Sequence, residues 1–209
     1  MSEPAVLSGP VDLSLGGIGF AGTGSVGTGS GGWAKEVVGG CPRSLTESLA
    51  GAVRARGSWQ QVADRVADVL RANPPDPGIL TPEQRAGDPS GYQTHLLHAE
   101  PDGSFSVTVM VWLPGQETPI HDHLAWCVTA VMEGAEQEEI YAVDGGRLRV
   151  VARNANPVGA VSAFAPPGDI HLVRNAGTSV AISMHVYGTD ISRVGSSVRR
   201  VYDPRLIRA

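Results

Sequence analysis

The sequence has few cysteines, no long hydrophobic run and no excess of basic residues, and each shortage argues against a class of protein. Its 209 residues include only two cysteines, Cys41 and Cys127, which argues against a disulfide framework and favours a reducing, cytoplasmic location. No apolar run approaches the roughly 18 residues of a membrane-spanning helix, and no basic and then apolar signal segment opens the chain. With a formal net charge of -5, we expect neither a nucleic acid nor an anionic membrane as a partner.

Glycine and serine dominate residues 1–40, which we expect to form a flexible arm. Three of these glycines, Gly22, Gly24 and Gly27, match the G-x-G-x-x-G spacing of dinucleotide-binding loops. That spacing requires a strand before it, a helix after it and an acidic residue about 20 positions later, and no strong βαβ pattern follows. We therefore reject this interpretation, and we expect residues 41–209 to form one domain.

Residues 44–72 carry the signals of two helices. Ser44 and Glu47 have the spacing of a capping box, which marks a helix N-terminus. Apolar side chains then recur at helical intervals, at Val62, Val66, Val69 and Leu70. The proline-rich segment 73–82 should end the helical order, because proline removes a backbone donor and clashes with the preceding turn.

From Tyr92 onward the hydrophobic period changes to two, and turn signals follow at short intervals. Seven segments have this strand pattern: 105–113, 126–132, 138–143, 146–152, 160–166, 171–177 and 179–188. A helical segment followed by seven or more short strands predicts a mainly β fold, an antiparallel sandwich or small barrel with N-terminal helices.

Histidine is the most informative residue type, because all six histidines lie between residues 95 and 185. In the segment PIHDHLAWC, His121 and His123 are separated by one residue. On a strand both side chains would point to one face, where they can bind one ion, while Asp122 points to the other. The spacing also arises by chance, so two hydrogen-bonded or solvated histidines at a strand end remain the alternative.

The residues around this pair resemble the two sequence motifs of the cupin family. The first motif has the family's spacing over Gly115, His121, His123, Cys127 and Gly134, and the second over Pro166, Gly168, His171 and Asn175. Two departures are present: Cys127 stands where the family usually has a glutamate ligand, and Gly159 is one position out of register. The resemblance implies a double-stranded β-helix, or jelly-roll barrel, over about residues 92–203, with a metal bound by His121, His123 and His171.

Three neutral imidazoles leave a divalent ion with its full charge and with open positions, which favours binding of a thiolate. Among cupins the chain resembles the thiol dioxygenases, namely cysteine dioxygenase and 3-mercaptopropionate dioxygenase. Ser183, His185 and Tyr187 match that family's Ser-x-His-x-Tyr relay. The resemblance implies Fe(II) as cofactor, O2 as co-substrate, a small thiol as substrate and a sulfinate as product, with Tyr187 acting on the bound oxygen or substrate.

Further positions resemble one branch of the family or the other. Trp126 and the segment 92–98 resemble the 3-mercaptopropionate branch, whereas Cys127 resembles cysteine dioxygenases in which this cysteine forms a thioether with the relay tyrosine. A Cys127–Tyr187 cross-link is therefore a hypothesis, and a small buried side chain is its alternative. Trp126, together with Trp112, is a candidate wall of the substrate site, with a place in the core as the alternative.

The position that binds the substrate carboxylate is altered. Thr94 stands where cysteine dioxygenases have an arginine and the 3-mercaptopropionate enzymes a glutamine, and threonine cannot bind a carboxylate bidentately. The 3-mercaptopropionate branch has another such arginine after the relay tyrosine, for which Arg199 and Arg200 are candidates and Arg193 stays open. For each of them a solvated surface position is an almost equal alternative.

Two other functions are compatible with the same residues. A divergent cupin could convert cysteine to another product, by further oxidation or by a rearrangement such as sulfonamide formation, and Ni(II) could then replace Fe(II) because imidazole binds both. A non-enzymatic cupin could bind a metal or small ligand, although such a protein has no need of an oriented phenol. Acyl transfer by Cys127 ranks last, since hydrophobic neighbours surround it in sequence. We expect a monomer or homodimer.

Overall fold

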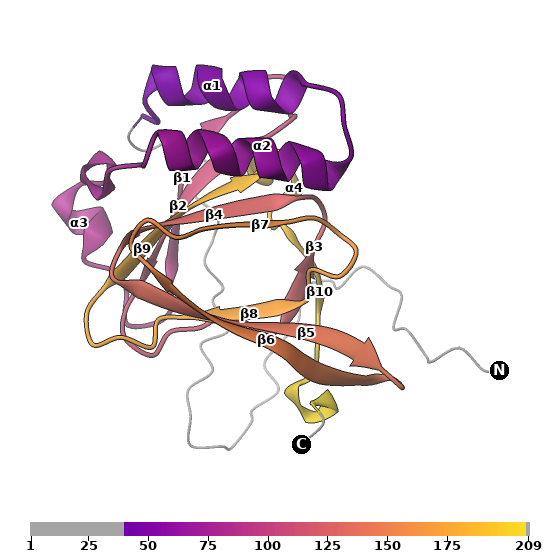
Figure 1. Ribbon diagram of the computed structural model, residues 1–209. Coiled ribbons are helices and arrows are strands. Elements are labelled where there is room, and N and C mark those ends of the chain that lie inside the picture. The colour runs from indigo at the N-terminus through magenta and orange to yellow at the C-terminus, as the bar shows by residue number, and fades with distance from the viewer. Residues whose placement is uncertain (1–39, 208–209) are drawn as a thin grey trace.

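The computed structural model describes residues 40–207 (Figure 1). The expected arm and the glycines Gly22, Gly24 and Gly27 lie outside the described residues. Helices and 3₁₀ turns occupy α1 (Arg43–Arg54), α2 (Trp59–Ala72), η1 (Pro77–Ile79), α3 (Pro82–Arg85), α4 (Ile191–Val194) and η2 (Pro204–Leu206). The strands are β1 (Gln93–Ala99), β2 (Ser106–Trp112), β3 (His121–His123), β4 (Cys127–Glu133), β5 (Ala135–Asp144), β6 (Arg147–Pro157), β7 (Val161–Phe164), β8 (His171–Arg174), β9 (Ala181–Tyr187) and β10 (Val198–Val201).

The two predicted helices are present as α1 and α2, but the predicted capping box of α1 is wrong. Helix α1 begins at Arg43 directly after Pro42, so Ser44 already lies inside the first turn and no side chain caps the helix. Glu47 pairs instead with Arg43, with 2.8 Å between Nε and Oε1. The capping box occurs on α2, where Ser58 and Gln61 each bind the other's backbone N–H.

Two five-stranded antiparallel sheets form the barrel, with strand orders β1-β2-β9-β4-β7 and β10-β3-β8-β5-β6. Helices α1 and α2 lie side by side over the outer face of the first sheet, and the second sheet lies on its other side (Figure 1). Each of the seven segments with the strand pattern overlaps a strand of the structure. The mainly β fold with N-terminal helices is therefore confirmed.

Alternation along the first sheet separates its two faces. Val109, Val128 and Met184 lie on the face that packs against Leu49 and Val66 of the helices, and all five are fully buried. Burial of one such side chain stabilises the fold by about 1.5–3 kcal/mol. The residues at the alternate positions point into the barrel. On β9 these are the polar residues Ser183, His185 and Tyr187.

A glycine of the first cupin motif is required where β4 turns into β5. Gly134 has a φ of 70°, and a Cβ atom at this position would lie 2.6 Å from the carbonyl oxygen of Val180. Both observations disfavour any side chain here. The motif therefore reflects a close approach of the chain to the segment before β9.

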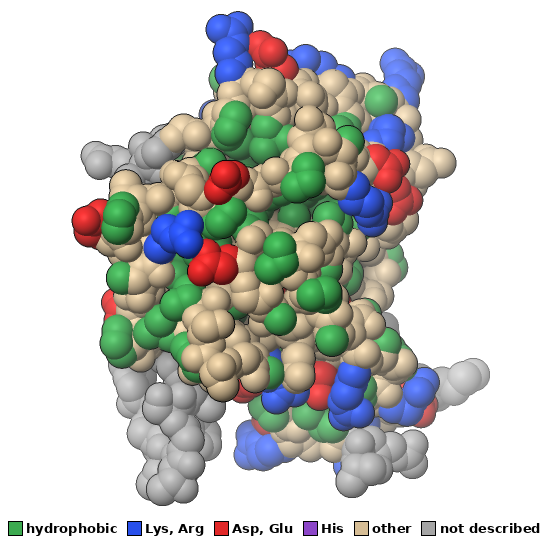
Figure 2. Space-filling view, turned by 60° about the vertical axis from the view of Figure 1, so that its left-hand side comes forward, with side chains coloured by type: hydrophobic (Ala, Val, Ile, Leu, Met, Phe, Trp, Pro, Cys, Tyr) green, Lys and Arg blue, Asp and Glu red, His purple; other side chains and the backbone are tan. Residues whose placement is uncertain are grey.

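Charged side chains of both signs are interspersed among hydrophobic and uncharged ones on the face drawn in Figure 2. Among residues 40–207, no helix is both long enough and apolar enough to cross a membrane.

Candidate metal centre

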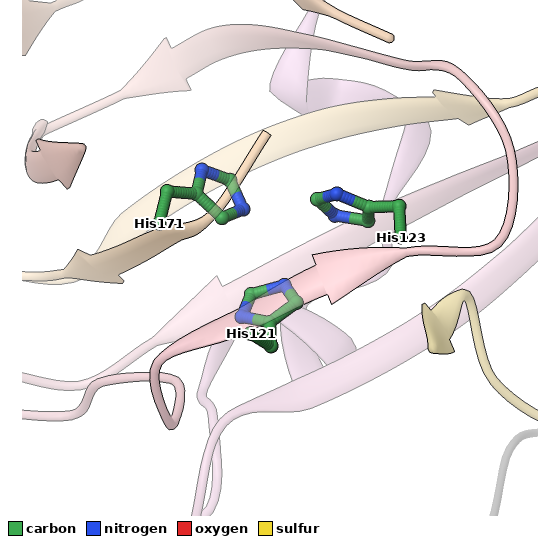
Figure 3. A group of neighbouring side chains, drawn as sticks. All are labelled: His121, His123 and His171. Atoms are coloured by element: carbon green, nitrogen blue, oxygen red, sulfur yellow. The ribbon is translucent and has the colours of Figure 1, made fainter. Parts of the chain in front are cut away.

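Three buried histidines from two strands converge inside the barrel. His121 and His123 lie on β3, and His171 lies on β8 directly opposite His121 in the antiparallel pair. The possible ligand atoms of the three side chains all lie within 4.8 Å of one another. Figure 3 shows the three imidazoles around a common space. The structure thus brings together the three residues that the sequence proposes as metal ligands.

Each of the three rings is held through its Nδ1 atom. His121 Nδ1 lies 2.9 Å from the carbonyl oxygen of Pro119, His123 Nδ1 lies 3.0 Å from Asp169 Oδ2, and His171 Nδ1 lies 2.7 Å from Glu138 Oε1. Because each of these oxygens accepts a hydrogen bond from Nδ1, the neutral imidazole carries its proton on Nδ1. The unprotonated Nε2 atom is then left to coordinate a metal ion. All three histidines therefore have the tautomer and orientation of metal ligands.

The electrostatics of the site favour neutral imidazoles. Burial, followed by the charges of the neighbouring histidines, lowers the pKa of His121 well below its usual value and the pKa of His171 to about 3. Although burial alone would raise it, hydrogen bonds from the side chain and backbone of His123 lower the pKa of Asp169. Neutral imidazole is the form that binds a metal, so this set of donors fits a divalent transition-metal ion.

The sequence analysis missed Asp169 and Glu138, which orient two of the ligands. Asp169 stands two residues before His171, and Glu138 is 2% exposed on β5. Glu136 and Glu138 occupy alternate positions of a strand, and both are buried. Acidic residues at the inward-facing positions of a strand were the available signal, because a buried carboxylate requires a partner.

A small cavity adjoins the three histidines. It is lined by Met110, Trp112, Thr118, His121, His123, Cys127, His171, Val173, His185 and Tyr187. No arginine or lysine of residues 40–207 is among these lining residues. Besides the three candidate metal ligands, the lining therefore consists of apolar and hydroxyl-bearing side chains, one thiol and one further imidazole.

The three relay residues form a hydrogen-bonded chain on β9. Ser183 Oγ lies 2.9 Å from His185 Nε2, and the Tyr187 hydroxyl lies 3.3 Å from His185 Nδ1. Burial, followed by the charges of the three candidate ligands, lowers the pKa of His185 to about 3, and burial raises the pKa of Tyr187 well above its usual value. All three groups are consequently neutral at pH 7, and the chain ends at the cavity with the phenol.

Cys127 and Tyr187 are directly opposite residues of β4 and β9. Opposite residues of an antiparallel pair point to the same face with their Cβ atoms about 4.5–5.5 Å apart, and both side chains line the cavity. Burial, with the charges of Glu138 and Asp169, raises the pKa of the Cys127 thiol well above its usual value. A buried thiol of this kind is a poor nucleophile, and the cross-link with Tyr187 stays a prediction.

The candidate substrate residues are less closely grouped. Thr94 on β1 pairs with Met110, a cavity residue, and so lies on the inward face of the sheet. Trp126 does not line the cavity: it belongs to the core between the sheet and the helices, and its indole covers Gly188. Of the two tryptophans, only Trp112 borders the cavity.

The structure places the three candidate arginines away from the cavity lining. Arg199 holds Asp122, with 2.5 Å between Nη2 and Oδ2, and Asp122 points to the opposite face of β3 from the candidate metal ligands. Arg200 is exposed and pairs with Asp122 in the β10–β3 register, and Arg193 pairs with Asp190. None of them is among the residues that line the cavity, and their role in substrate binding stays a prediction.

Comparison with known proteins gives one family match and a set of distant structural neighbours. The family described as cysteine dioxygenase type I matches residues 81–199. A cupin 2 conserved barrel domain protein from Salinispora arenicola is 23% identical over 54% of this chain and 90% of that chain, with a TM-score of 0.39. A cupin domain of an XRE family transcriptional regulator from Enterobacter cloacae is 17% identical over 46% of this chain and 94% of that chain, with a TM-score of 0.35.

The family match spans both candidate ligand segments, the relay and most of the barrel. Membership implies dioxygenase chemistry at a non-haem metal, which the three-histidine cluster fits. This chain belongs to the cysteine dioxygenase type I family.

Proposed function

We propose that the protein is an Fe(II)-dependent thiol dioxygenase that converts a small thiol, such as cysteine or 3-mercaptopropionate, to its sulfinate. One observation supports this most strongly: a three-histidine centre and a neutral serine–histidine–tyrosine chain meet at the same cavity. A metal-binding protein without catalysis has no need of an oriented phenol beside the metal.

The reaction balances without a further reductant or oxidant. A thiolate and one molecule of O2 give a sulfinate: two sulfur–oxygen bonds form, the oxygen–oxygen bond breaks, and sulfur loses the electrons that oxygen gains. Iron(II), when bound by His121, His123 and His171, supplies the charge that stabilises a thiolate and the redox chemistry that activates O2.

The chain's own residues position the reactants and exclude water. Asp169 and Glu138 keep the ligand rings in place. Tyr187 presents a neutral phenol at the cavity, oriented by His185 and Ser183, and so can donate a hydrogen bond to a small ligand there. Met110, Trp112 and Val173 supply apolar walls, which strengthen these electrostatic interactions.

A substrate carboxylate would be recognised by hydroxyl groups near the cavity or by an arginine. Thr94 lies on the inward face of β1 and Thr118 borders the cavity, so hydroxyl groups are available nearby. Arg199 and Arg200 stay candidates, although Arg199 would first have to leave Asp122. A carboxylate-bearing substrate would therefore compete with a buried carboxylate of the protein for this arginine.

A metal analysis followed by oxygen uptake tests the proposal. The protein is purified without added metal, its metal content is determined, and oxygen consumption by the iron-loaded protein is measured with cysteine, 3-mercaptopropionate and thiols that lack a carboxylate. We expect iron, together with a sulfinate formed in a one-to-one ratio to the O2 consumed. Failure of every thiol to support oxygen uptake would contradict the function. The variant H123A, which lacks one candidate ligand, is the control for metal-independent oxidation.

A second candidate is supported by the altered carboxylate position, with Thr94 in place of an arginine and Arg199 bound to Asp122. A divergent enzyme of this family could oxidise or rearrange cysteine to a product other than the sulfinate, and Ni(II) could serve it as well as Fe(II). Mass analysis of the product formed from cysteine distinguishes the two, because a plain sulfinate at a good rate excludes the second.

A further inference from the structure

Glu136 is a buried carboxylate that the proposed reaction does not use. It lies on β5, two residues before Glu138, and is 2% exposed. Whereas Glu138 holds His171, no ion pair joins Glu136 to a cation within residues 40–207, and its Oε1 atom has no hydrogen-bond partner there. A buried carboxylate without a cation costs several kcal/mol, so its retention calls for a physical reason.

The neighbours of Glu136 connect it to the relay. Burial, with the charge of Glu138, raises the pKa of Glu136 to about 7, while the polar side chains of Ser183 on β9 and Trp112 on β2 act in the opposite direction and favour its ionised form. On the neighbouring strand β6, the residue opposite Glu136 is the uncharged Asn156. Tyr187 is a titratable group that interacts electrostatically with Glu136. Glu136 thus lies at the end of the relay that is remote from the cavity.

The protons of the chain can be assigned from donor and acceptor capacity. The Ser183 hydroxyl has one proton and two lone pairs. The Trp112 indole can only donate, and its Nε1 lies 3.2 Å from Ser183 Oγ, so it occupies one lone pair. The remaining lone pair and the proton are shared between Glu136 and His185 Nε2, which lies 2.9 Å away.

The protonation state of Glu136 then determines the direction of every hydrogen bond in the relay. An ionised carboxylate only accepts, so Ser183 donates to Glu136, His185 Nε2–H donates to Ser183, and the Tyr187 hydroxyl donates to His185 Nδ1. A protonated Glu136 donates to Ser183 and reverses every bond: Ser183 donates to Nε2, Nδ1–H donates to the Tyr187 oxygen, and the phenol proton is free to point into the cavity.

We infer that Glu136 accepts the proton that a thiol loses when it binds in the cavity as a thiolate, through Tyr187, His185 and Ser183. One proton enters at the Tyr187 oxygen as the sulfur–hydrogen bond breaks, one moves along each link, and one arrives on the Glu136 carboxylate. Every link returns to a neutral state, and the negative charge moves from Glu136 to sulfur. The phenol then faces the cavity as a donor. This inference rests on the proposed function, because it needs a thiol as the source of the proton.

A proton count on thiol binding tests the transfer without catalysis. The Fe(II)-loaded full-length chain is mixed anaerobically with cysteine or 3-mercaptopropionate at about pH 8, where the free thiols keep most of their protons. A pH indicator in weakly buffered solution measures the protons released. We expect close to none for the wild type and about one per bound thiol for E136Q, because the amide cannot accept the proton. The control E139Q makes the same change on β5 at a residue bound to Arg153 and Arg174, and should behave as the wild type.

The metal-free protein gives a second, independent readout. With ¹⁵N-labelled histidine, the nitrogen chemical shifts of His185 report which ring nitrogen carries the proton. In the wild type we expect a change from Nε2–H to Nδ1–H as the pH falls through about 7, and in E136Q and S183A no such change near that pH. Circular dichroism verifies that the variants are folded.

The outcomes separate this inference from the proposed function. If thiols bind and the wild type and E136Q release the same number of protons, Glu136 is not the acceptor. If the His185 tautomer is independent of pH and of both substitutions, Glu136 does not control the relay. If no thiol binds, the proposed function and the proton source both fail, while the histidine spectra still decide whether Glu136 is coupled to His185.

Discussion

A single oxygen of Asp169 holds His123 at two points. Its Oδ2 atom accepts the backbone N–H of His123 at 2.9 Å and lies 3.0 Å from the ring Nδ1. Both residues are buried, and the two bonds join the segment directly before β8 to the neighbouring strand β3. The backbone position and the ring orientation of one metal ligand therefore depend on the same carboxylate.

Replacement of Asp169 by asparagine should weaken metal binding. An amide oxygen is a weaker acceptor than a carboxylate, so the His123 ring becomes less basic and less firmly oriented. For D169N we expect a metal affinity about 10–100-fold lower, measured by competition with a chromophoric chelator. D64N, on the exposed face of α2, is the matched control and should keep the wild-type affinity. Equal affinities for D169N and the wild type would show that the ring is held sufficiently by packing alone.

Removal of the Tyr187 hydroxyl should impair turnover without loss of metal. Y187F removes the terminal hydroxyl of the relay from a residue that lines the cavity, and loss of a positioned proton donor typically costs about 10²–10⁴-fold in rate. Oxygen uptake and metal content are measured on the same samples. Y141F is the control, because Tyr141 packs in a separate core cluster and its hydroxyl binds Glu139. An unchanged rate for Y187F would favour the non-enzymatic binding function.

Cys127 and Tyr187 should become covalently linked under aerobic turnover. Formation of a thioether removes one hydrogen from the thiol and one from the phenol ring, with O2 as the oxidant. The intact mass should therefore fall by two hydrogens, and Cys127 should resist alkylation in the unfolded protein. C127A should show neither change. An unmodified mass with a free, alkylatable Cys127 would leave this residue as a small buried side chain of the cavity.

Arg199 should contribute to stability through Asp122. The Asp122 carboxylate is almost fully buried and accepts hydrogen bonds from Arg199 and from the Tyr202 hydroxyl, so R199A leaves a buried charge with fewer partners. We expect the free energy of unfolding to fall by about 1–2 kcal/mol after allowance for the part-exposed guanidinium, as measured by urea denaturation. R200A, at an exposed neighbour, is the control. If R199A instead raises KM selectively for carboxylate-bearing thiols, Arg199 binds the substrate carboxylate.

The metal-free protein should lose stability as the pH falls, and His185 should account for part of the loss. Its pKa is about 3 in the folded state, against about 6.5 in an unfolded chain. Below about pH 6.5 the unfolded chain binds a proton that the folded chain does not. Each such histidine therefore lowers the free energy of unfolding by about 1.4 kcal/mol per pH unit until about pH 3. Urea denaturation between these limits, with a chelator present, should give a smaller slope for H185N. Identical slopes would mean that His185 is protonated in the folded state.

The local pattern of the chain predicts much of the barrel and its centre. A period of two along β2, β4 and β9 follows from one face packing on the helices and the other lining the barrel. The same period predicts that His121 and His123 share a face, and that Ser183, His185 and Tyr187 can bind one another. Residues that lie two apart on one strand interact through local geometry alone, so the sequence is sufficient for them.

What only the tertiary structure decided is the pairing of residues that lie far apart in the chain. Glu138 meets His171, Glu136 meets the relay and Arg199 meets Asp122 because the order of the strands brings them together, and no local period encodes that order. The same reason separates Trp112, which borders the cavity, from Trp126, which packs on the helix side. The ligands could therefore be read from the sequence, whereas the carboxylates that orient them and the surroundings of the substrate depend on how the two sheets are assembled.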